Sequence, residues 1–260
     1  MQIDPDALGE ELFIARRDRV PVAPLTERFP DITVDDAYAV QGVFARRIAA
    51  EEGASVSGYK LGLTSKPMQE LLGLDQPDYG PVLSTMVYDD HTEIPVDRFI
   101  HPKVEAELAV ILGEDLTGPG VTTLDASRAI SGAVAAIELV DSRIVDWRIG
   151  LCDTVADLAS CGAITLAGRE VPVEGWEPRL VGMTMFKNGE MVATGAGAAA
   201  LGDPVAAVAW LANTLGPYGV TIEAGQFVMT GSLHAAFDVA PGDTARAEFD
   251  RLGPVTMRFV

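Results

Sequence analysis

The amino-acid sequence predicts an α+β protein in which a helical N-terminal segment precedes a strand-rich core. Two observations support this prediction. The first 55 residues have the apolar spacing and end signals of helices, whereas later residues form short β-branched runs between Gly, Pro and Asp turns. With 260 residues, 48% of them hydrophobic, the chain is long enough to bury a substantial core. We therefore predict a helical segment over residues 1–55 and a core domain over residues 56–260.

Two helices are expected in the N-terminal segment. The first opens with Asp4 and Pro5, a pair typical of the N-cap and the first helical position. The second opens with Thr33 and Asp36, which match a capping box, and it ends at Gly53, a residue that suits a left-handed C-terminal position. Both predictions rest on local signals.

The core is expected to consist mainly of strands. Its β-branched runs are SVSGYKLGL, VEAELAVIL, AVAAIELVDSRIV, GAITLAG, LVGMTMFKNGEMVATG, QFVMTGSL, TARAEFD and PVTMRFV. The dipeptide Asn188-Gly189 supplies the two positive-φ residues of a type I′ hairpin. One clear helix opens at Asp203 and Pro204, and a second helix is expected over residues 153–160.

The charge of the chain excludes several kinds of partner. The formal net charge is −19, so nucleic acid is not an expected partner, because phosphate contacts need clustered Lys and Arg. An anionic membrane surface is disfavoured for the same reason, and no stretch resembles a signal peptide or a long apolar membrane span. Cys152 and Cys161 are expected to be reduced thiols, which favours a cytoplasmic protein.

Two acids stand two residues apart in HPKVEAELAV, residues 101–110. Apolar residues alternate with Glu105 and Glu107, which predicts a strand with both carboxylates on one face, about 6–7 Å apart. Glu138 lies in the apolar run AVAAIELV, and Glu is almost never buried without a partner. Three carboxylates from two strands would form a site for Mg²⁺ or Mn²⁺. The alternative is an exposed strand face with solvated acids, and the spacing leaves both open.

Two further residues are candidates for acid–base chemistry. Lys60 lies between Gly58 and Gly62 in GYKLGLTS, where a partly buried lysine would suit an anionic substrate or a proton transfer. The alternative for Lys60 is a surface lysine whose stem packs on apolar groups. Asp78, in QPDYGP, is either a turn-forming side chain or a catalytic carboxylate.

Five stretches of the chain, in order, carry a family resemblance. They are GYKLGLTS, PDYG, HPKVEAELAV, IELVDSRIVDWRIGLCDTVADLAS and VAPGDTARAEFDRLGPVTMRF. Together they resemble the 2-keto-4-pentenoate hydratases, in the hydratase/decarboxylase branch of the fumarylacetoacetate hydrolase superfamily. The resemblance covers nearly the whole chain. It implies a helical N-terminal segment and a catalytic core built as a mixed β-roll or barrel of the fumarylacetoacetate hydrolase C-terminal type.

The resemblance also implies roles for individual residues. It implies that Mg²⁺ or Mn²⁺ is bound by Glu105, Glu107 and Glu138. It implies catalytic roles for Lys60 and Asp78, with the direction of proton transfer unassigned. Members of the family are typically homo-oligomers, often pentamers or decamers.

Some positions depart from the family pattern. Leu158 and Cys161 stand where the family usually has Asn and Ser, and His234 stands where a small or hydroxyl residue is expected. These positions bear on which substrate is bound. Ser160 keeps the pattern, and Gly62 allows close approach of a ligand, so we expect both to contact the substrate.

The resemblance implies a hydro-lyase of aromatic or steroid catabolism. The expected reaction adds water to 2-hydroxypenta-2,4-dienoate, or a close analogue, to give a 4-hydroxy-2-oxo acid. The first alternative is 4-oxalocrotonate decarboxylase, which uses the same metal ligands on a diacid. Hydrolysis of an acylpyruvate ranks lower. A non-catalytic scaffold, bound to a partner enzyme of the pathway, is the alternative outside catalysis.

Overall fold

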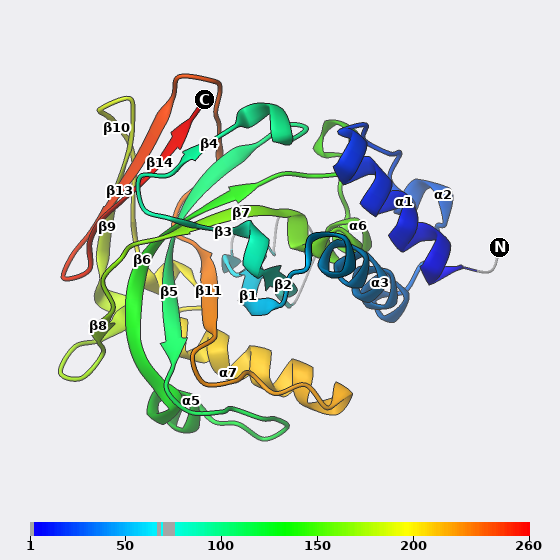
Figure 1. Ribbon diagram of the computed structural model, residues 1–260. Coiled ribbons are helices and arrows are strands. Elements are labelled where there is room, and N and C mark those ends of the chain that lie inside the picture. Colours follow the sequence, from blue (N-terminus) through cyan, green and yellow to red (C-terminus); the bar gives the residue numbers. More distant parts are fainter. Residues whose placement is uncertain (1–2, 67–68, 70–75) are drawn as a thin grey trace.

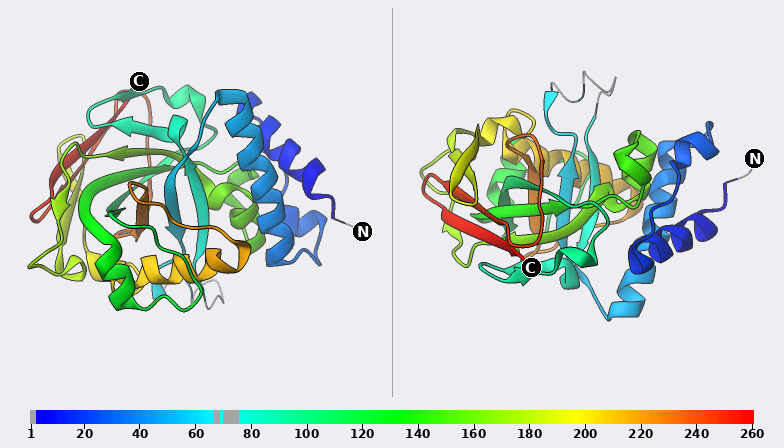
Figure 2. Two further views of the ribbon diagram at one scale, coloured as in Figure 1. Left: turned by 60° about the horizontal axis from the view of Figure 1, so that its bottom comes forward. Right: turned by 90° about the horizontal axis from the view of Figure 1, so that it is seen from above.

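The computed structural model describes residues 3–66, 69 and 76–260. A large curled sheet lies at the centre, with the N-terminal helices on one side and a smaller sheet on the other (Figure 1). Two further views show the same arrangement from below and from above (Figure 2). The helical N-terminal segment and the strand-rich α+β core are therefore confirmed.

The N-terminal helices begin and end where their capping residues predict. The Asp4 side chain accepts hydrogen bonds from the first turn, and Thr33 and Asp36 form both bonds of a capping box. Gly53 follows the last helical residue with a positive φ of 65°. The helices are α1 (Pro5–Asp18), α2 (Leu25–Arg28) and α3 (Val34–Glu52).

The larger sheet contains nine strands among the described residues, and most of them run in the order β2-β1-β11-β5-β6-β7-β3. Two short strands lie off this path, β8 beside β6 and β12 beside β5. The strands are β1 (Val56–Gly62), β2 (Asp78–Leu83), β3 (Val87–Asp89), β5 (Lys103–Leu112), β6 (Ile130–Val140), β7 (Cys161–Leu166), β8 (Val171–Pro172), β11 (Phe227–Ser232) and β12 (Phe237–Asp238).

The smaller sheet contains the hairpin predicted from Asn188 and Gly189. Both residues have positive φ and connect β9 to β10. The order within this sheet is β10-β9-β13-β14-β4. Its strands are β4 (Glu93–Ile94), β9 (Gly182–Lys187), β10 (Glu190–Ala196), β13 (Thr244–Phe249) and β14 (Gly253–Phe259).

Two apolar clusters hold these layers together. One lies between the two sheets and α7 (Pro204–Leu215), and it includes Leu108, Met185 and Leu211. The other lies between the large sheet and the N-terminal helices, and it includes Phe44. Because β6 is buried along almost its whole length, polar side chains on it are enclosed by the protein. The division of the chain at residue 55 stays a prediction.

The helix expected over residues 153–160 is only partly correct. The structure has α6 (Leu151–Ala156), and the following 3₁₀ turn contains Leu158, Ala159 and Ser160, all with φ between 50° and 57°. Left-handed residues cannot continue a right-handed helix, and each costs roughly 1–2 kcal/mol. The sequence reading also missed α5 (Thr123–Ala129), a short helix whose capping box resembles that of α3.

One helical stretch needs comment because it is apolar. Residues Gly197–Tyr218 are long and apolar enough to cross a membrane by length and composition alone. The stretch contains Asp203 and Pro204, and α7 within it packs on β11 and α5. A core helix passes the same test, so this feature is weak evidence for a membrane span.

The close approach of β1 and β11 gives a test of the fold around Lys60. Gly58 pairs with Phe227, and an added Cβ would lie 2.2 Å from the Phe227 carbonyl oxygen. Gly58→Ala is therefore expected to lower the free energy of unfolding by about 1–3 kcal/mol, measured by urea denaturation. Gly182→Ala in β9 is the matched control, because no atom lies within 4 Å of its added Cβ. Equal stability of the two variants would contradict this packing.

Candidate metal centre and active site

Strand register brings three glutamates together. In the antiparallel pair of β5 and β6, Glu105 lies directly opposite Glu138, and Glu107 projects from the same face of β5. One carboxylate oxygen from each residue lies within 4.8 Å of the others. At the bulge in β11 the Gly231 N–H donates to Glu107 Oε2 over 2.8 Å, which orients that carboxylate. The solvated strand face considered above is therefore wrong.

The three carboxylates stand in surroundings that disfavour their charge. Burial raises the pKa of Glu105 to about 7, and the nearby Glu138 adds to the shift. Burial also raises the pKa values of Glu107 and Glu138. Neither Glu138 oxygen accepts a well-aligned hydrogen bond, although the residue is fully buried; the Lys60 ammonium lies 3.2 Å from Oε1 as an ion-pair partner. A hard oxygen donor set with unsatisfied buried carboxylate oxygens fits a divalent cation such as Mg²⁺ or Mn²⁺.

Lys60 is the cation of this cluster. It lies on β1 with 3% of its surface exposed, so the alternative of a surface lysine is wrong. Its Nζ donates to the Ala159 carbonyl oxygen over 2.7 Å and lies 3.2 Å from Glu138 Oε1. Burial by itself lowers the pKa of Lys60, but the negative charges of Glu138 and Asp78 raise it by more than burial lowers it. The net shift is therefore upward, and Lys60 stays protonated.

Asp78 is buried on the strand next to Lys60. It pairs with Gly62 across β1 and β2, and both of its oxygens lack a hydrogen-bond partner. Burial raises its pKa, and the charge of Lys60 opposes that shift without cancelling it. A Cβ at Gly62 would lie 2.2 Å from Asp78 Oδ1, so a larger residue here would displace the Asp78 carboxylate. The role of Gly62 in substrate binding stays a prediction.

The left-handed turn of Leu158, Ala159 and Ser160, named here the 158–160 turn, borders the same site. Ser160 is buried, and its hydroxyl has no hydrogen-bond partner, which leaves it available to a ligand. Leu158 is fully buried, and its carbonyl packs where a Cβ on Gly80 would lie. The departure from Asn at position 158 therefore places an apolar side chain in the core.

His234 supports the strand that carries two of the glutamates. The Ala106 N–H donates to His234 Nε2 over 2.9 Å, and His234 Nδ1 lies 2.7 Å from the Ala235 carbonyl oxygen. Burial lowers the pKa of His234, which favours the neutral ring that this acceptor role needs. Sequence reasoning missed this role because the partner is a backbone amide 128 residues away.

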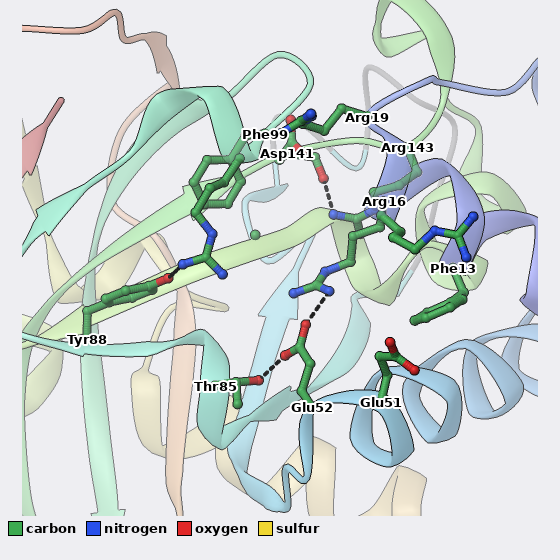
Figure 3. Close-up of a pocket in the computed structure, with 13 residues that line it drawn as sticks. Phe13, Arg16, Arg19, Glu51, Glu52, Thr85, Tyr88, Phe99, Asp141 and Arg143 are labelled. Atoms are coloured by element: carbon green, nitrogen blue, oxygen red, sulfur yellow. Dashed lines mark hydrogen bonds and ion pairs between the residues drawn. The ribbon is translucent and has the colours of Figure 1, made fainter.

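A cavity of about 220 Å³ lies elsewhere, between the N-terminal helices and the core. Its arginines already have partners: Arg16 pairs with Glu52, and Arg98 donates to the Tyr88 hydroxyl (Figure 3). None of the proposed metal ligands or catalytic residues lines it. We call it the arginine pocket and do not place the active site there.

The comparisons with known proteins agree with this geometry. Residues 63–260 match the family described as fumarylacetoacetate (FAA) hydrolase C-terminal. The chain belongs to this family. It is 41% identical to the 2-keto-4-pentenoate hydratase of Paraburkholderia xenovorans strain LB400, over 96% of this chain and 93% of that protein. It is 47% identical to the 2-hydroxypent-2,4-dienoate hydratase of Pseudomonas putida, over 82% of this chain and 96% of that protein.

Solved structures of fumarylacetoacetate hydrolase family members share the fold. The 4-oxalocrotonate decarboxylase of Pseudomonas putida G7, complexed with magnesium and adipate, superimposes with a TM-score of 0.95. It is 38% identical and covers 98% of this chain and 97% of its own. A fumarylpyruvate hydrolase from Pseudomonas aeruginosa, 15% identical over 78% of this chain and 88% of its own, has a TM-score of 0.63 and shares the fold alone.

Removing divalent cations is expected to destabilise the protein more at high pH. The pKa of Glu105 is about 7 in the folded protein against an ordinary value of 4.5, so the folded state keeps a proton that the unfolded state releases. Stability without metal therefore falls as pH rises from about 4.5 through about 7, and a bound cation offsets the loss. The melting-temperature gap between samples with Mg²⁺ and with EDTA should widen from about pH 5 to about pH 8.

Glu105→Gln is the control for this measurement. The amide does not titrate and is a weaker metal ligand than a carboxylate, so the gap of this variant should be smaller and should widen less with pH than that of the unchanged protein. A gap that stays constant across this range in the unchanged protein would contradict a metal site at the three glutamates.

Proposed function

We propose that this protein is a metal-dependent hydro-lyase that adds water to 2-hydroxypenta-2,4-dienoate or a close analogue, giving a 4-hydroxy-2-oxo acid in the catabolism of aromatic compounds or steroids. The observation that carries the proposal is the meeting of Glu105, Glu107 and Glu138 with Lys60 in one buried site, in a chain similar to hydratases along its length. Mg²⁺, or Mn²⁺ in its place, is the ion proposed for the three glutamates. When bound, it would supply a Lewis acid that polarises the oxygens of the substrate.

Lys60 and Asp78 are proposed to share the proton transfers. Protonation of the dienol at C5, with loss of the 2-hydroxyl proton, gives an α,β-unsaturated ketone, and water then adds with its oxygen at C4 and its proton at C3. Lys60 keeps its ammonium because the surrounding carboxylates stabilise the charge. The raised pKa of Asp78 favours a carboxylic acid that can release a proton and take one back from water.

The remaining residues bind and orient the substrate in this proposal. The chain has a net charge of −19, so an anionic substrate needs local positive charge, which Lys60 provides. The unpartnered Ser160 hydroxyl and the backbone at Gly62 are proposed to contact the substrate oxygens. A homo-oligomer, as a pentamer or decamer, and a cytoplasmic location with the thiols Cys152 and Cys161 reduced complete the proposal.

Decarboxylation of 4-oxalocrotonate is the second candidate, because the structure resembles that decarboxylase so closely. A diacid needs a second cation for its far carboxylate. Among the described residues the buried cations are Lys60 and Arg143, and Arg143 is paired with Asp157. The sequence of residues 67–75 adds no Lys or Arg. This favours a monoacid and hence the hydratase.

A non-catalytic scaffold that binds a partner enzyme of the pathway is disfavoured. Such a protein has no need to keep Glu107, Glu138, Asp78 and Lys60 buried together, since buried charges lower stability unless something compensates them. An acylpyruvate hydrolase is also disfavoured, because the fumarylpyruvate hydrolase shares the fold alone.

A parallel ultraviolet assay tests the proposed reaction. We expect the absorbance of 2-hydroxypenta-2,4-dienoate to disappear with Mg²⁺ and to persist after treatment with EDTA, because the three carboxylates need the ion to hold the substrate. We expect no release of CO₂ from 4-oxalocrotonate under the same conditions. Turnover of 4-oxalocrotonate in place of the dienol would establish the decarboxylase, and inertness toward both would favour the scaffold.

Substitution of single site residues separates binding from chemistry. Glu138→Gln is expected to weaken Mg²⁺ binding by at least about 10²-fold in isothermal titration, because it removes a charged ligand. Lys60→Met is expected to lower kcat by about 10²–10⁴-fold, because it removes a proton donor. Glu190→Gln, on the exposed strand β10, is the matched control and should change neither quantity. Full activity of Lys60→Met would contradict its catalytic role.

A further inference from the structure

Arg143 is a buried cation to which the proposed reaction gives no role. Its side chain is 1% exposed, and it follows the strand that carries Glu138. Its guanidinium donates to Asp157 Oδ1 over 2.5 Å, to the carbonyl oxygens of Asp141 and Cys161 over 2.6 and 3.0 Å, and to the Asp157 carbonyl. One planar group therefore binds Asp157 and Cys161 at the same time.

Asp157 and Cys161 are the residues immediately before and after the 158–160 turn. Three consecutive side-chain-bearing residues with positive φ are unfavourable, and such backbone persists only where the surroundings fix it. Within the turn the Ser160 N–H donates to the Asp157 carbonyl over 2.9 Å, and the Asp141 N–H donates to the Ser160 carbonyl over 2.8 Å. The guanidinium of Arg143 links the two ends from the outside.

The 158–160 turn contacts Lys60, contains Ser160 and packs beside the strand that carries Asp78. The Ala159 carbonyl accepts the 2.7 Å hydrogen bond from Lys60 Nζ. The Ser160 hydroxyl is buried without a partner. The Leu158 carbonyl packs against Gly80, two residues after Asp78 on β2. A shift of the turn would therefore move the partner of Lys60 and the Ser160 hydroxyl together.

We propose that Arg143 is a positioning residue for the reaction, an inference that rests on the proposed function. It clamps both ends of the 158–160 turn, so that the Ala159 carbonyl aims Lys60 at Glu138 and the Ser160 hydroxyl faces the substrate. Arg143 contacts neither the metal ligands nor the substrate. A single-point cation cannot replace it, because only the planar guanidinium reaches Asp157 and the carbonyls of Asp141 and Cys161 together.

A purely structural role makes a different prediction. Removing one partner of a buried ion pair is strongly destabilising, so variants of Arg143 and Asp157 are compared only where they are folded. The glutamates are fixed by the β5–β6 ladder, to which the turn does not belong. Loss of the clamp should therefore lower turnover while metal binding is kept, whereas loss of general stability would lower both.

Kinetics with Mg²⁺ provide the first measurement. Arg143→Ala is expected to lower kcat on the dienol by about 10²-fold, the effect of misplacing a catalytic group by about 1 Å, while the dissociation constant for Mg²⁺ changes by less than about threefold. Arg143→Lys should recover only part of the loss, and Asp157→Asn should resemble Arg143→Ala. Arg98→Ala, in the arginine pocket, is the matched control and should keep its kcat.

The arginine pocket also allows chemical rescue. Arg143 and Gly162 line this cavity, and Figure 3 shows the Arg143 guanidinium at its wall with its bond to Asp141. Added guanidinium chloride, kept far below denaturing concentrations, can enter the space left in Arg143→Ala and should raise its kcat. The unchanged protein and Arg98→Ala should show no such gain. An equal gain in all three would overturn the clamp.

Amide hydrogen exchange tests the clamp without any turnover. The peptide covering residues 157–161 should exchange faster in Arg143→Lys and Asp157→Asn than in Arg98→Ala, while peptides from β5 and β6 stay unchanged. If the unchanged protein converts neither substrate, the proposed function fails, and this measurement still decides whether the clamp exists. Normal kcat in folded Arg143→Ala would overturn the proposal. If that variant does not fold, normal kcat in Asp157→Asn would overturn it. Equal losses of kcat and of Mg²⁺ affinity would also overturn it.

Discussion

Burial of like charges is the constraint on which this structure depends. Glu105, Glu107 and Glu138 meet in the interior with one lysine nearby, and their repulsion and desolvation oppose folding. A divalent cation is the simplest group that turns this arrangement from unfavourable to favourable. Lys60 and Asp78 lie around the same charge centre, so the proposed metal binding, substrate binding and proton transfer would be electrostatically linked.

The residues of the proposed site are held in place in two different ways, by paired strands and by an irregular turn. The glutamates stand on two long paired strands, enclosed by a second sheet on one side and helices on the other. Lys60 is also on a strand, but its carbonyl partner belongs to the left-handed 158–160 turn, which is unfavourable by itself. The proposed metal ligands are thus fixed by regular hydrogen bonding, whereas the proposed acid–base group depends on a turn that buried polar contacts hold in place.

The distribution of charge supports the proposal that the site binds a small anion with one carboxylate. The surface is strongly acidic, which suppresses non-specific binding of anions. Within the site one lysine offers positive charge, and the second buried cation, Arg143, is taken up by Asp157 and backbone carbonyls. In the proposal, this buried arginine therefore fixes the geometry of the 158–160 turn and does not bind a second substrate carboxylate.

The sequence by itself determined the features that depend on residues close together along the chain. Capping residues placed the first helices, Asn188-Gly189 placed a hairpin, and the two-residue period of a strand put Glu105 and Glu107 on one face. The local sequence also made Lys60 and Asp78 candidates, and the family resemblance implied catalytic roles for them. Only the tertiary structure decided that these side chains are buried together, because their distances depend on the strand order β2-β1-β11-β5-β6.

Tertiary structure alone also decided the supporting residues. The sequence could have indicated that Arg143 is buried, by the same reasoning that was applied to Glu138. A charged side chain beside an apolar run is buried only with a partner. Its partner Asp157 and the left-handed turn beyond it are fixed by contacts between segments distant in sequence. Local propensity favours continuing the helix there, and long-range hydrogen bonds overrule it because they form only when the sheet and the helices have packed.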